Sequence, residues 1–211
     1  MKSDAELISA LTESDQYIKL KGLAGPRRFN VFDALDEAFS ENTSSRFLRH
    51  ILDSDEGHGL GMKVVQALVN LQSRPIPTEV RKAFAHTEST SATFNARTSD
   101  GYYLDILAVG SDDEHRPTFA LGIENKIDAS EQPDQLRHYQ AHLIRTFQRV
   151  PKAILYLTKY GDAPTTADES ANCPVISISH GDISGVLTKI AGDERNGTDW
   201  TVLLSPTPPP A

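Results

Sequence analysis

Two short apolar segments that carry charged side chains constrain this chain most. Residues 102–109 place Asp105 inside an apolar run, and residues 118–126 place Glu124 and Lys126 at the end of another. Both segments have the length and composition of β-strands. A charge in a buried strand costs free energy unless it is paired or binds a metal. Three such charges on two neighbouring strands therefore indicate a site rather than an ordinary core.

The spacing of these charges predicts how they meet. Side chains alternate between the two faces of a strand, so Glu124 and Lys126 point the same way. If the two strands pair, Asp105 can join them. Two carboxylates beside a lysine suit a hard cation such as Mg²⁺, which prefers oxygen ligands. A metal-bound water becomes a nucleophile near neutral pH, and a nearby lysine can orient or deprotonate it. The cluster therefore indicates metal-dependent phosphodiester hydrolysis.

The pattern of these charges resembles the PD-(D/E)xK nuclease superfamily, which has the restriction-endonuclease-like fold. Asp105 matches the first motif aspartate, and Glu124 and Lys126 match the E-x-K. Leu104 stands where the family name has proline. The resemblance extends over about residues 30–190, nearly the whole chain.

Two flanking segments strengthen this resemblance. Gln135 and Tyr139 are four residues apart and share one helical face. They resemble the Q-x-x-x-Y element of RecB-like members, in which the Gln and Tyr lie beside the active site and contact the substrate or support the lysine. Glu41 opens a segment similar to the first-helix motif of a bacterial subgroup, and in such families this glutamate is an additional acid of the metal site.

The resemblance implies a Mg²⁺- or Mn²⁺-dependent nuclease. Asp105 and Glu124 would hold the metal, with the backbone carbonyl of Asn125 as an extra ligand. Glu41 would act as an outer or second-metal acid, and Lys126 would position the attacking water and stabilise charge on the phosphate. The resemblance also implies products with a 5′-phosphate and favours DNA as the substrate. Bacterial relatives are frequently accessory or anti-phage defence proteins, which is an analogy only.

Each signal also has an ordinary structural interpretation. The three charges can form an ion-paired edge, Gln135 and Tyr139 can be ordinary helix residues, and Glu41 is favoured in a first helical turn by the helix dipole. A second hypothesis for function is therefore a catalytically inactive nuclease-fold domain that binds protein or nucleic acid. A third is a fragment whose activity needs a C-terminal segment or a partner.

The net charge argues against a protein that coats nucleic acid. The chain has 21 basic and 29 acidic residues, which gives −8, whereas non-specific binding needs many phosphate contacts. Residues 135–152 nevertheless contain no acid and form a local basic face. Its helical stripe consists of His138, His142, Arg145 and Arg149. Arg145 and Arg149 are candidates for substrate contact, although such a stripe can equally be a solvated helix face.

Cysteine content and hydropathy bear on location. Cys173 is the single cysteine, so no internal disulfide can form, which agrees with the cytoplasm. No apolar run approaches the roughly 20 residues that span a bilayer, so no membrane partner is expected. The sequence leaves a homodimer or a partner protein open.

The predicted fold class is α/β, with a restriction-endonuclease-like mixed central sheet flanked by helices and an N-terminal helical segment. The expected divisions are an N-terminal helix and loop (1–28), the nuclease-like domain (29–195) and a proline-rich, disordered or extended tail (196–211). Helices are expected within 1–20 and at 31–39, 41–52, 62–71, about 131–149 and 182–191. Strands are expected at 80–95, around Asp105 and Glu124, and at 152–158 and 174–179.

Overall fold

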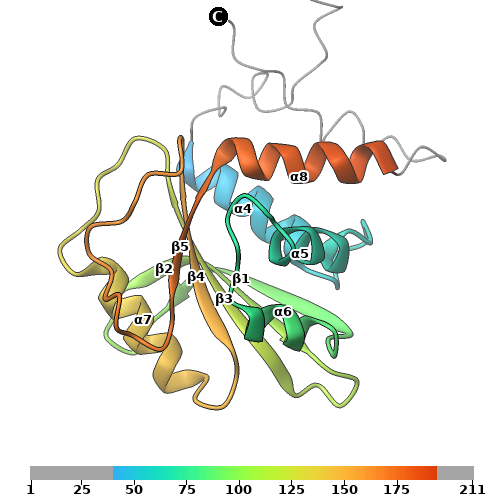
Figure 1. The fold of residues 1–211 in the computed structure, drawn as a ribbon, viewed down its shortest axis with the longest axis horizontal. Coiled ribbons are helices and arrows are strands. Elements are labelled where there is room, and N and C mark those ends of the chain that lie inside the picture. The colour runs from blue at the N-terminus through green and yellow to red at the C-terminus, as the bar shows by residue number, and fades with distance from the viewer. Residues whose placement is uncertain (1–39, 194–211) are drawn as a thin grey trace, which may run out of the picture.

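The computed structural model describes residues 40–193, in which a five-stranded mixed sheet is covered by helices on both faces (Figure 1). The helices expected within 1–20 and at 31–39, and the proline-rich tail, lie outside these residues. The helices are α4 (Glu41–Leu52), α5 (Gly61–Val69), α6 (Thr78–Phe84), α7 (Gln135–Thr146) and α8 (His180–Asp193). The strands are β1 (Ser89–Arg97), β2 (Tyr103–Ser111), β3 (Pro117–Lys126), β4 (Lys152–Thr158) and β5 (Val175–Ser179).

The strand order follows the chain, β1-β2-β3-β4-β5. The pairs β1–β2 and β2–β3 are antiparallel, whereas β3–β4 and β4–β5 are parallel. The crossover from β3 to β4 contains α7, as a parallel connection requires. Because β2 runs against β3 and β4, its first residues lie at the same edge of the sheet as the last residues of β3 and β4. Residues from three strands therefore meet at this edge.

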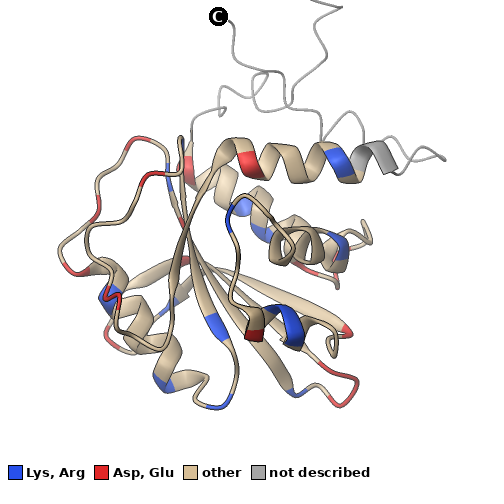
Figure 2. Cartoon of the chain, in the orientation of Figure 1, with Lys and Arg blue, Asp and Glu red and all other residues tan. Residues whose placement is uncertain are grey.

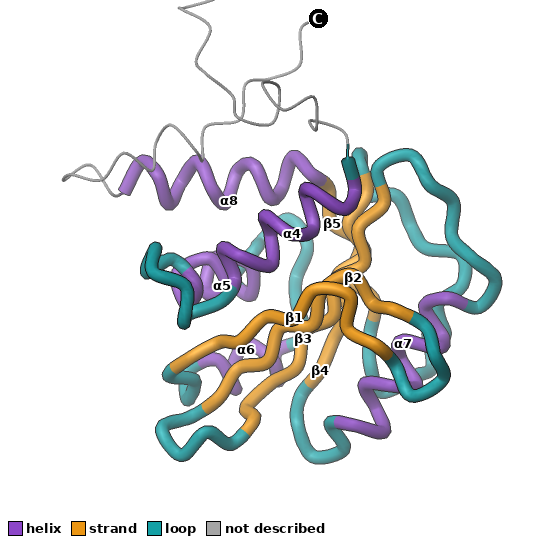
Figure 3. Tube along the Cα trace, turned by 180° about the vertical axis from the view of Figure 1, so that it is seen from behind, coloured by secondary structure: helices purple, strands orange, loops and turns teal. Residues whose placement is uncertain are grey.

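The two faces of the sheet carry separate apolar clusters. Among the helices of residues 40–193, α4, α5, α6 and α8 cover one face and α7 covers the other, as the reverse view shows (Figure 3). On α7 the side chains of Leu136, Tyr139 and Leu143 form an apolar stripe that is buried against the sheet. Every residue of β4 is buried, as is typical of a parallel strand covered on both faces.

Gly122 on β3 lets α7 lie close to the sheet. A Cβ atom there would be 3.0 Å from Leu104 Cδ2 and 3.3 Å from Leu143 Cδ1 on α7. Any larger side chain would push the helix away from the strand. The close approach matters because Gln135 and Tyr139 of the same helix lie above Glu124, two residues beyond this glycine.

Two sequence predictions of secondary structure are wrong in part. The strand expected at 80–95 is helix α6 followed by β1, because Pro77 precedes the first helical turn and Glu79 in that turn favours a helix. The helix expected at about 131–149 spans only Gln135–Thr146. Pro133 disfavours helix at the residue before it, and Asp134 has a left-handed backbone with φ 55°. The helix at 41–52 and the strand at 152–158 are confirmed.

The described helices are short or amphipathic. Within residues 40–193, none combines the length and the apolar character needed to cross a membrane.

Candidate active site

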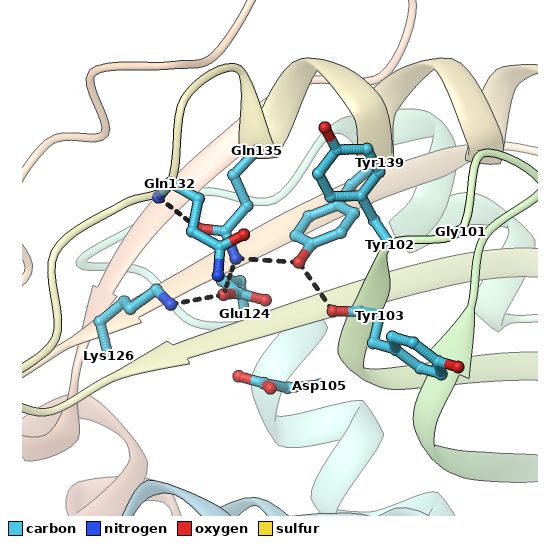
Figure 4. A pocket seen from close by; sticks show the side chains of 9 residues that line it. All are labelled: Gly101, Tyr102, Tyr103, Asp105, Glu124, Lys126, Gln132, Gln135 and Tyr139. Atoms are coloured by element: carbon cyan, nitrogen blue, oxygen red, sulfur yellow. Dashed lines mark hydrogen bonds and ion pairs between the residues drawn. The ribbon is translucent and has the colours of Figure 1, made fainter.

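Asp105, Glu124 and Lys126 meet in one pocket at the edge of the sheet where β2 begins and β3 ends (Figure 4). The pocket has a volume of about 430 Å³. It is lined by Gly101, Tyr102, Tyr103, Asp105, Glu124, Lys126, Gln132, Gln135 and Tyr139. The sequence prediction that two carboxylates and a lysine cluster at a sheet edge is therefore realised in the geometry.

Asp105 lies where β2 and β3 stop pairing. The ladder between the two strands ends at Ile106 and Ile123, one residue before Asp105 would face Glu124. Beyond this point Oδ2 of Asp105 accepts a hydrogen bond from the backbone N–H of Asn125 at 2.8 Å. Burial raises the pKa of Asp105, although the Asn125 hydrogen bond and the Lys126 charge oppose the rise. The carboxylate thus joins two strands that have begun to separate.

Glu124 and Lys126 form a buried ion pair. Nζ of Lys126 lies 2.9 Å from Oε1 of Glu124, and the two side chains are 12% and 2% exposed. Burial alone would lower the pKa of Lys126, but the carboxylates of Glu124, Asp105 and Glu41 raise it above its ordinary value. Lys126 is therefore a cation at neutral pH, so it can donate hydrogen bonds and stabilise negative charge.

One oxygen of Glu124 has no partner. Among residues 40–193, Oε2 of Glu124 is the one buried side-chain nitrogen or oxygen atom without a hydrogen bond. Burial and the nearby Asp105 charge raise the pKa of Glu124 to about 7, from an ordinary value of 4.5, despite the opposing Lys126 charge. A buried oxygen without a partner is costly in a native structure and calls for a functional explanation.

Gln135 and Tyr139 support Glu124 rather than the lysine. Nε2 of Gln135 donates to Oε1 of Glu124 at 2.7 Å and lies 2.9 Å from the hydroxyl of Tyr139. That hydroxyl donates to the backbone carbonyl of Tyr103 at 2.7 Å. The two side chains share a helical face as predicted. Their contacts join α7 to β3 and to the first residue of β2. The resemblance implied support of the lysine or contact with the substrate; neither side chain hydrogen-bonds Lys126 directly, and contact with the substrate stays a prediction.

Glu41 lies beside the cluster, but it does not line the pocket. Its Oε1 atom accepts hydrogen bonds from the backbone N–H groups of Ile127, Asp128 and Ala129, which follow β3. Its charge acts on both Asp105 and Lys126. In this arrangement Glu41 holds the loop that follows β3. Its role as a further acid of a metal site stays a prediction.

The side chain of Asn125 is a buried connection that the sequence reasoning missed. Its Nδ2 atom lies within hydrogen-bond distance of Glu41 O (3.2 Å), Ser44 Oγ (2.7 Å) and Ser45 Oγ (3.1 Å). Its Oδ1 faces Nε2 of His180 at 3.0 Å, so this nitrogen must carry the proton. Asn is uncommon inside strands, which was the available signal. Asn125 thus connects β3 to α4 and to the start of α8.

The basic stripe is shorter than predicted, because α7 ends at Thr146 and Arg149 lies in the turn that follows it. The remaining stripe is partly neutralised within the molecule. Arg145 forms an ion pair with Asp100 at 3.0 Å and also hydrogen-bonds Ser99. His138 lies 3.7 Å from the same carboxylate and stacks on Tyr102 with ring centroids 4.1 Å apart. These contacts hold the turn between β1 and β2, which forms one wall of the pocket. Neither Arg145 nor Arg149 lines the pocket, so their contact with substrate stays a prediction.

The oxygen donors fit a hard divalent cation. Two carboxylates, Asp105 and Glu124, face the pocket, and the free Oε2 of Glu124 offers a lone pair that no protein group uses. No set of three or more His, Cys, Asp or Glu side chains within residues 40–193 is arranged to hold a metal. The two carboxylates that face the pocket match cations such as Mg²⁺, which take one or two carboxylates and complete their shell with water and phosphate oxygens.

A comparison with protein families matches residues 29–205 to the PD-(D/E)XK nuclease superfamily. Comparisons with curated proteins and with solved structures found no match. The mixed sheet with helices on both faces is that of the restriction-endonuclease-like fold. Members of this superfamily generally use divalent metal ions, which agrees with the two carboxylates of the pocket. Because the match covers most of its length, the chain belongs to the PD-(D/E)XK nuclease superfamily.

Proposed function

We propose that this protein is a Mg²⁺- or Mn²⁺-dependent nuclease that hydrolyses phosphodiester bonds, with DNA as the substrate. The observation that carries the proposal is the buried, unpartnered Oε2 atom of Glu124 beside Asp105 and the Lys126 cation. The nuclease family of the chain supports it. An accessory or defence role follows only by analogy with bacterial relatives.

Each side chain of the carboxylate–lysine cluster has its own role in the proposed reaction. Asp105 and Glu124 would hold the cation, and the Asn125 backbone carbonyl, beside the N–H that binds Asp105, would be a further ligand. A bound divalent cation lowers the pKa of water and polarises a phosphoryl oxygen. Lys126 carries its proton, so it donates to the phosphate or to the attacking water and stabilises the developing charge.

The surrounding residues orient this cluster. Gln135 fixes Oε1 of Glu124 and leaves Oε2 facing the pocket, and Tyr139 holds the backbone at Tyr103. Glu41 holds the loop after Lys126 through three backbone N–H groups. Removing supporting residues of this kind from a metal site typically lowers metal affinity or activity by about 10- to 100-fold.

The test is cleavage of labelled single- and double-stranded DNA with Mg²⁺, Mn²⁺ or EDTA. Lys126→Ala should abolish metal-dependent cleavage while circular dichroism stays that of the wild type. Lys82→Ala is the matched control, because Lys82 is an exposed lysine on α6, outside the pocket. Cleavage that persists in Lys126→Ala would contradict the proposal. A well-folded wild-type protein that cuts neither substrate would support the non-catalytic binding domain instead.

A further inference from the structure

We propose that the pocket accepts an unpaired nucleotide strand, whose bases stack on Tyr103 and Tyr160 at either side of the carboxylate–lysine cluster. This inference rests on the proposed nuclease function and specifies the form of its substrate.

The two tyrosines flank the end of β3. Tyr103 is the first residue of β2 and lines the pocket two residues before Asp105 (Figure 4). Tyr160 follows β4 by two residues, and the last residue of β4, Thr158, pairs with Lys126 in the parallel register. One tyrosine therefore lies on the β2 side of the cluster and the other on the β4 side.

These side chains are unusual in their exposure. Tyr103 is 54% exposed and Tyr160 is 73% exposed, and the part of the chain that the structure describes has no other exposed large hydrophobic side chain. A single exposed aromatic residue needs no explanation. Two exposed aromatic residues at the sheet edge that carries the candidate active site do need an explanation. Tyr103 also projects from a fixed backbone, because Tyr139 donates a hydrogen bond to its carbonyl.

Each tyrosine has a cation beside it. Arg97 of β1 is the register partner of Tyr103, so both side chains leave the same face of the sheet. Nζ of Lys159 lies 5.4 Å from the ring centroid of Tyr160. Neither Arg97 nor Lys159 has an ion-pair partner among residues 40–193, whereas Arg145 is already paired with Asp100. Arg97 and Lys159 can therefore meet phosphates without breaking an existing ion pair.

Few other positive charges surround this edge. The loop after β3 and the loop after β4 carry several acidic residues, seen as red segments in Figure 2. They are Asp128, Glu131, Asp134, Asp162, Asp168 and Glu169. The acidic loops repel phosphates, so phosphate contacts alone would give weak affinity. Base stacking must therefore supply most of the binding free energy. Aromatic side chains stack on any base of a single strand, whereas a duplex hides its base faces.

The electrostatics give a quantitative expectation. Lys126 is already paired with Glu124, so the phosphate contacts that add a new charge pair are those at Arg97 and Lys159. Two such contacts predict that log K falls with log salt with a slope of about −1.4 for a single strand. A protein that bound mainly through its phosphate contacts would show a much steeper slope. The affinity for an unpaired strand should therefore depend little on salt.

The experiment measures binding in EDTA by fluorescence anisotropy, so that it requires no cleavage. The probes are a labelled single strand of about 15 nucleotides, the matching blunt duplex, an RNA of the same sequence and an abasic strand of equal length. Tyr103→Ala and Tyr160→Ala are each expected to weaken single-strand binding roughly 5- to 100-fold. Tyr103→Phe and Tyr160→Phe should restore it, because the ring is kept. Comparing the affinities for the DNA strand and for the RNA strand shows whether the protein prefers deoxyribose or ribose.

Several outcomes would overturn the inference: equal affinity for duplex and single strand, equal affinity for the abasic strand, wild-type affinity in both alanine variants, or no binding to any strand. These outcomes are separable from failure of the nuclease proposal. If the protein shows metal-dependent cleavage but the tyrosine variants bind as the wild type does, the nuclease proposal stands and the stacking proposal is rejected. If the tyrosine variants bind the single strand more weakly but the wild type does not cleave in Mg²⁺, the stacking proposal stands and the nuclease proposal is rejected.

Discussion

The side-chain amide of Gln135 donates to Oε1 of Glu124 at 2.7 Å and leaves the other carboxylate oxygen facing the pocket without a partner. Lys126 approaches the same Oε1 atom at 2.9 Å. The two donors therefore use one oxygen of Glu124 and orient the second. This division explains how a helix residue on α7 can control a carboxylate on β3.

Removing the Gln135 amide should weaken metal binding. We expect Gln135→Leu to lower Mn²⁺ affinity about 10- to 100-fold, because Glu124 loses the group that orients it. Isothermal titration calorimetry measures the change. The matched control is Gln140→Leu on the same helix. Gln140 is also buried, but it hydrogen-bonds the backbone of Asp168 and Cys173. Equal Mn²⁺ affinities of the two variants would contradict this role of Gln135.

The raised pKa of Glu124 predicts a pH-dependent cost in stability. In the folded protein Glu124 has a pKa of about 7, and in the unfolded chain its ordinary value is 4.5. Between these values the folded state binds more protons than the unfolded state, so the free energy of unfolding falls as pH rises. The cost is fully present above about pH 7 and amounts to at most about 3 kcal/mol.

Glu124→Gln removes this titration. Its free energy of unfolding, minus that of the wild type, should increase from about pH 4.5 to about pH 7 and then level off, as measured by urea denaturation without metal. Glu79→Gln, at an exposed glutamate of α6, provides the charge-matched control and should show no such trend. A difference for Glu124→Gln that shrinks with rising pH would show that the sign is wrong.

Filling the space at Gly122 should destabilise the protein. Gly122→Val places methyl groups against Leu104 and Leu143, where even a single Cβ lies at 3.0 to 3.3 Å. We expect a loss of about 1–3 kcal/mol in the free energy of unfolding, as for other overpacked cores. Chemical denaturation measures it. Gly57→Ala is the control, since nothing lies within 4 Å of its Cβ position. Its effect should stay within about 0.5 kcal/mol.

Asn125 and His180 should be energetically coupled. Their side chains meet at 3.0 Å, and removing His180 leaves the buried side-chain oxygen of Asn125 unpaired. A double-mutant cycle of Asn125→Ala and His180→Ala should give an interaction free energy of about 0.5–3 kcal/mol. The same cycle with His86→Ala, at an exposed histidine, should be additive within about 0.5 kcal/mol. Additivity in both cycles would mean that the Asn125–His180 contact contributes nothing to stability.

Local periodicity accounts for what could be predicted of the site. The alternation of side chains along a strand put Glu124 and Lys126 on one face, and the pocket contains both. The helical repeat put Gln135 and Tyr139 on one face, and they hydrogen-bond each other. The strand at 152–158 was found in full because its run of apolar residues is long and uninterrupted.

The errors lie where local signals conflict. The strand expected at 80–95 overlooked Val80, Ala83 and Phe84, whose i, i+3, i+4 spacing is that of a helix, and Pro77, which stands just before the first helical residue. The start of α7 was misplaced because the left-handed backbone of Asp134 has no signature in the apolar pattern.

The sequence by itself determined most of the described strands and helices and the shared face of Glu124 and Lys126, because these depend on repeats of two and 3.6 residues. Only the tertiary structure decided which groups meet across the chain. The partner of Gln135 is Glu124, the partner of Arg145 is Asp100, and Asn125 reaches residues about eighty positions before it. Such contacts depend on strand register and helix packing, which bring distant segments together, and no local repeat encodes the distance between them.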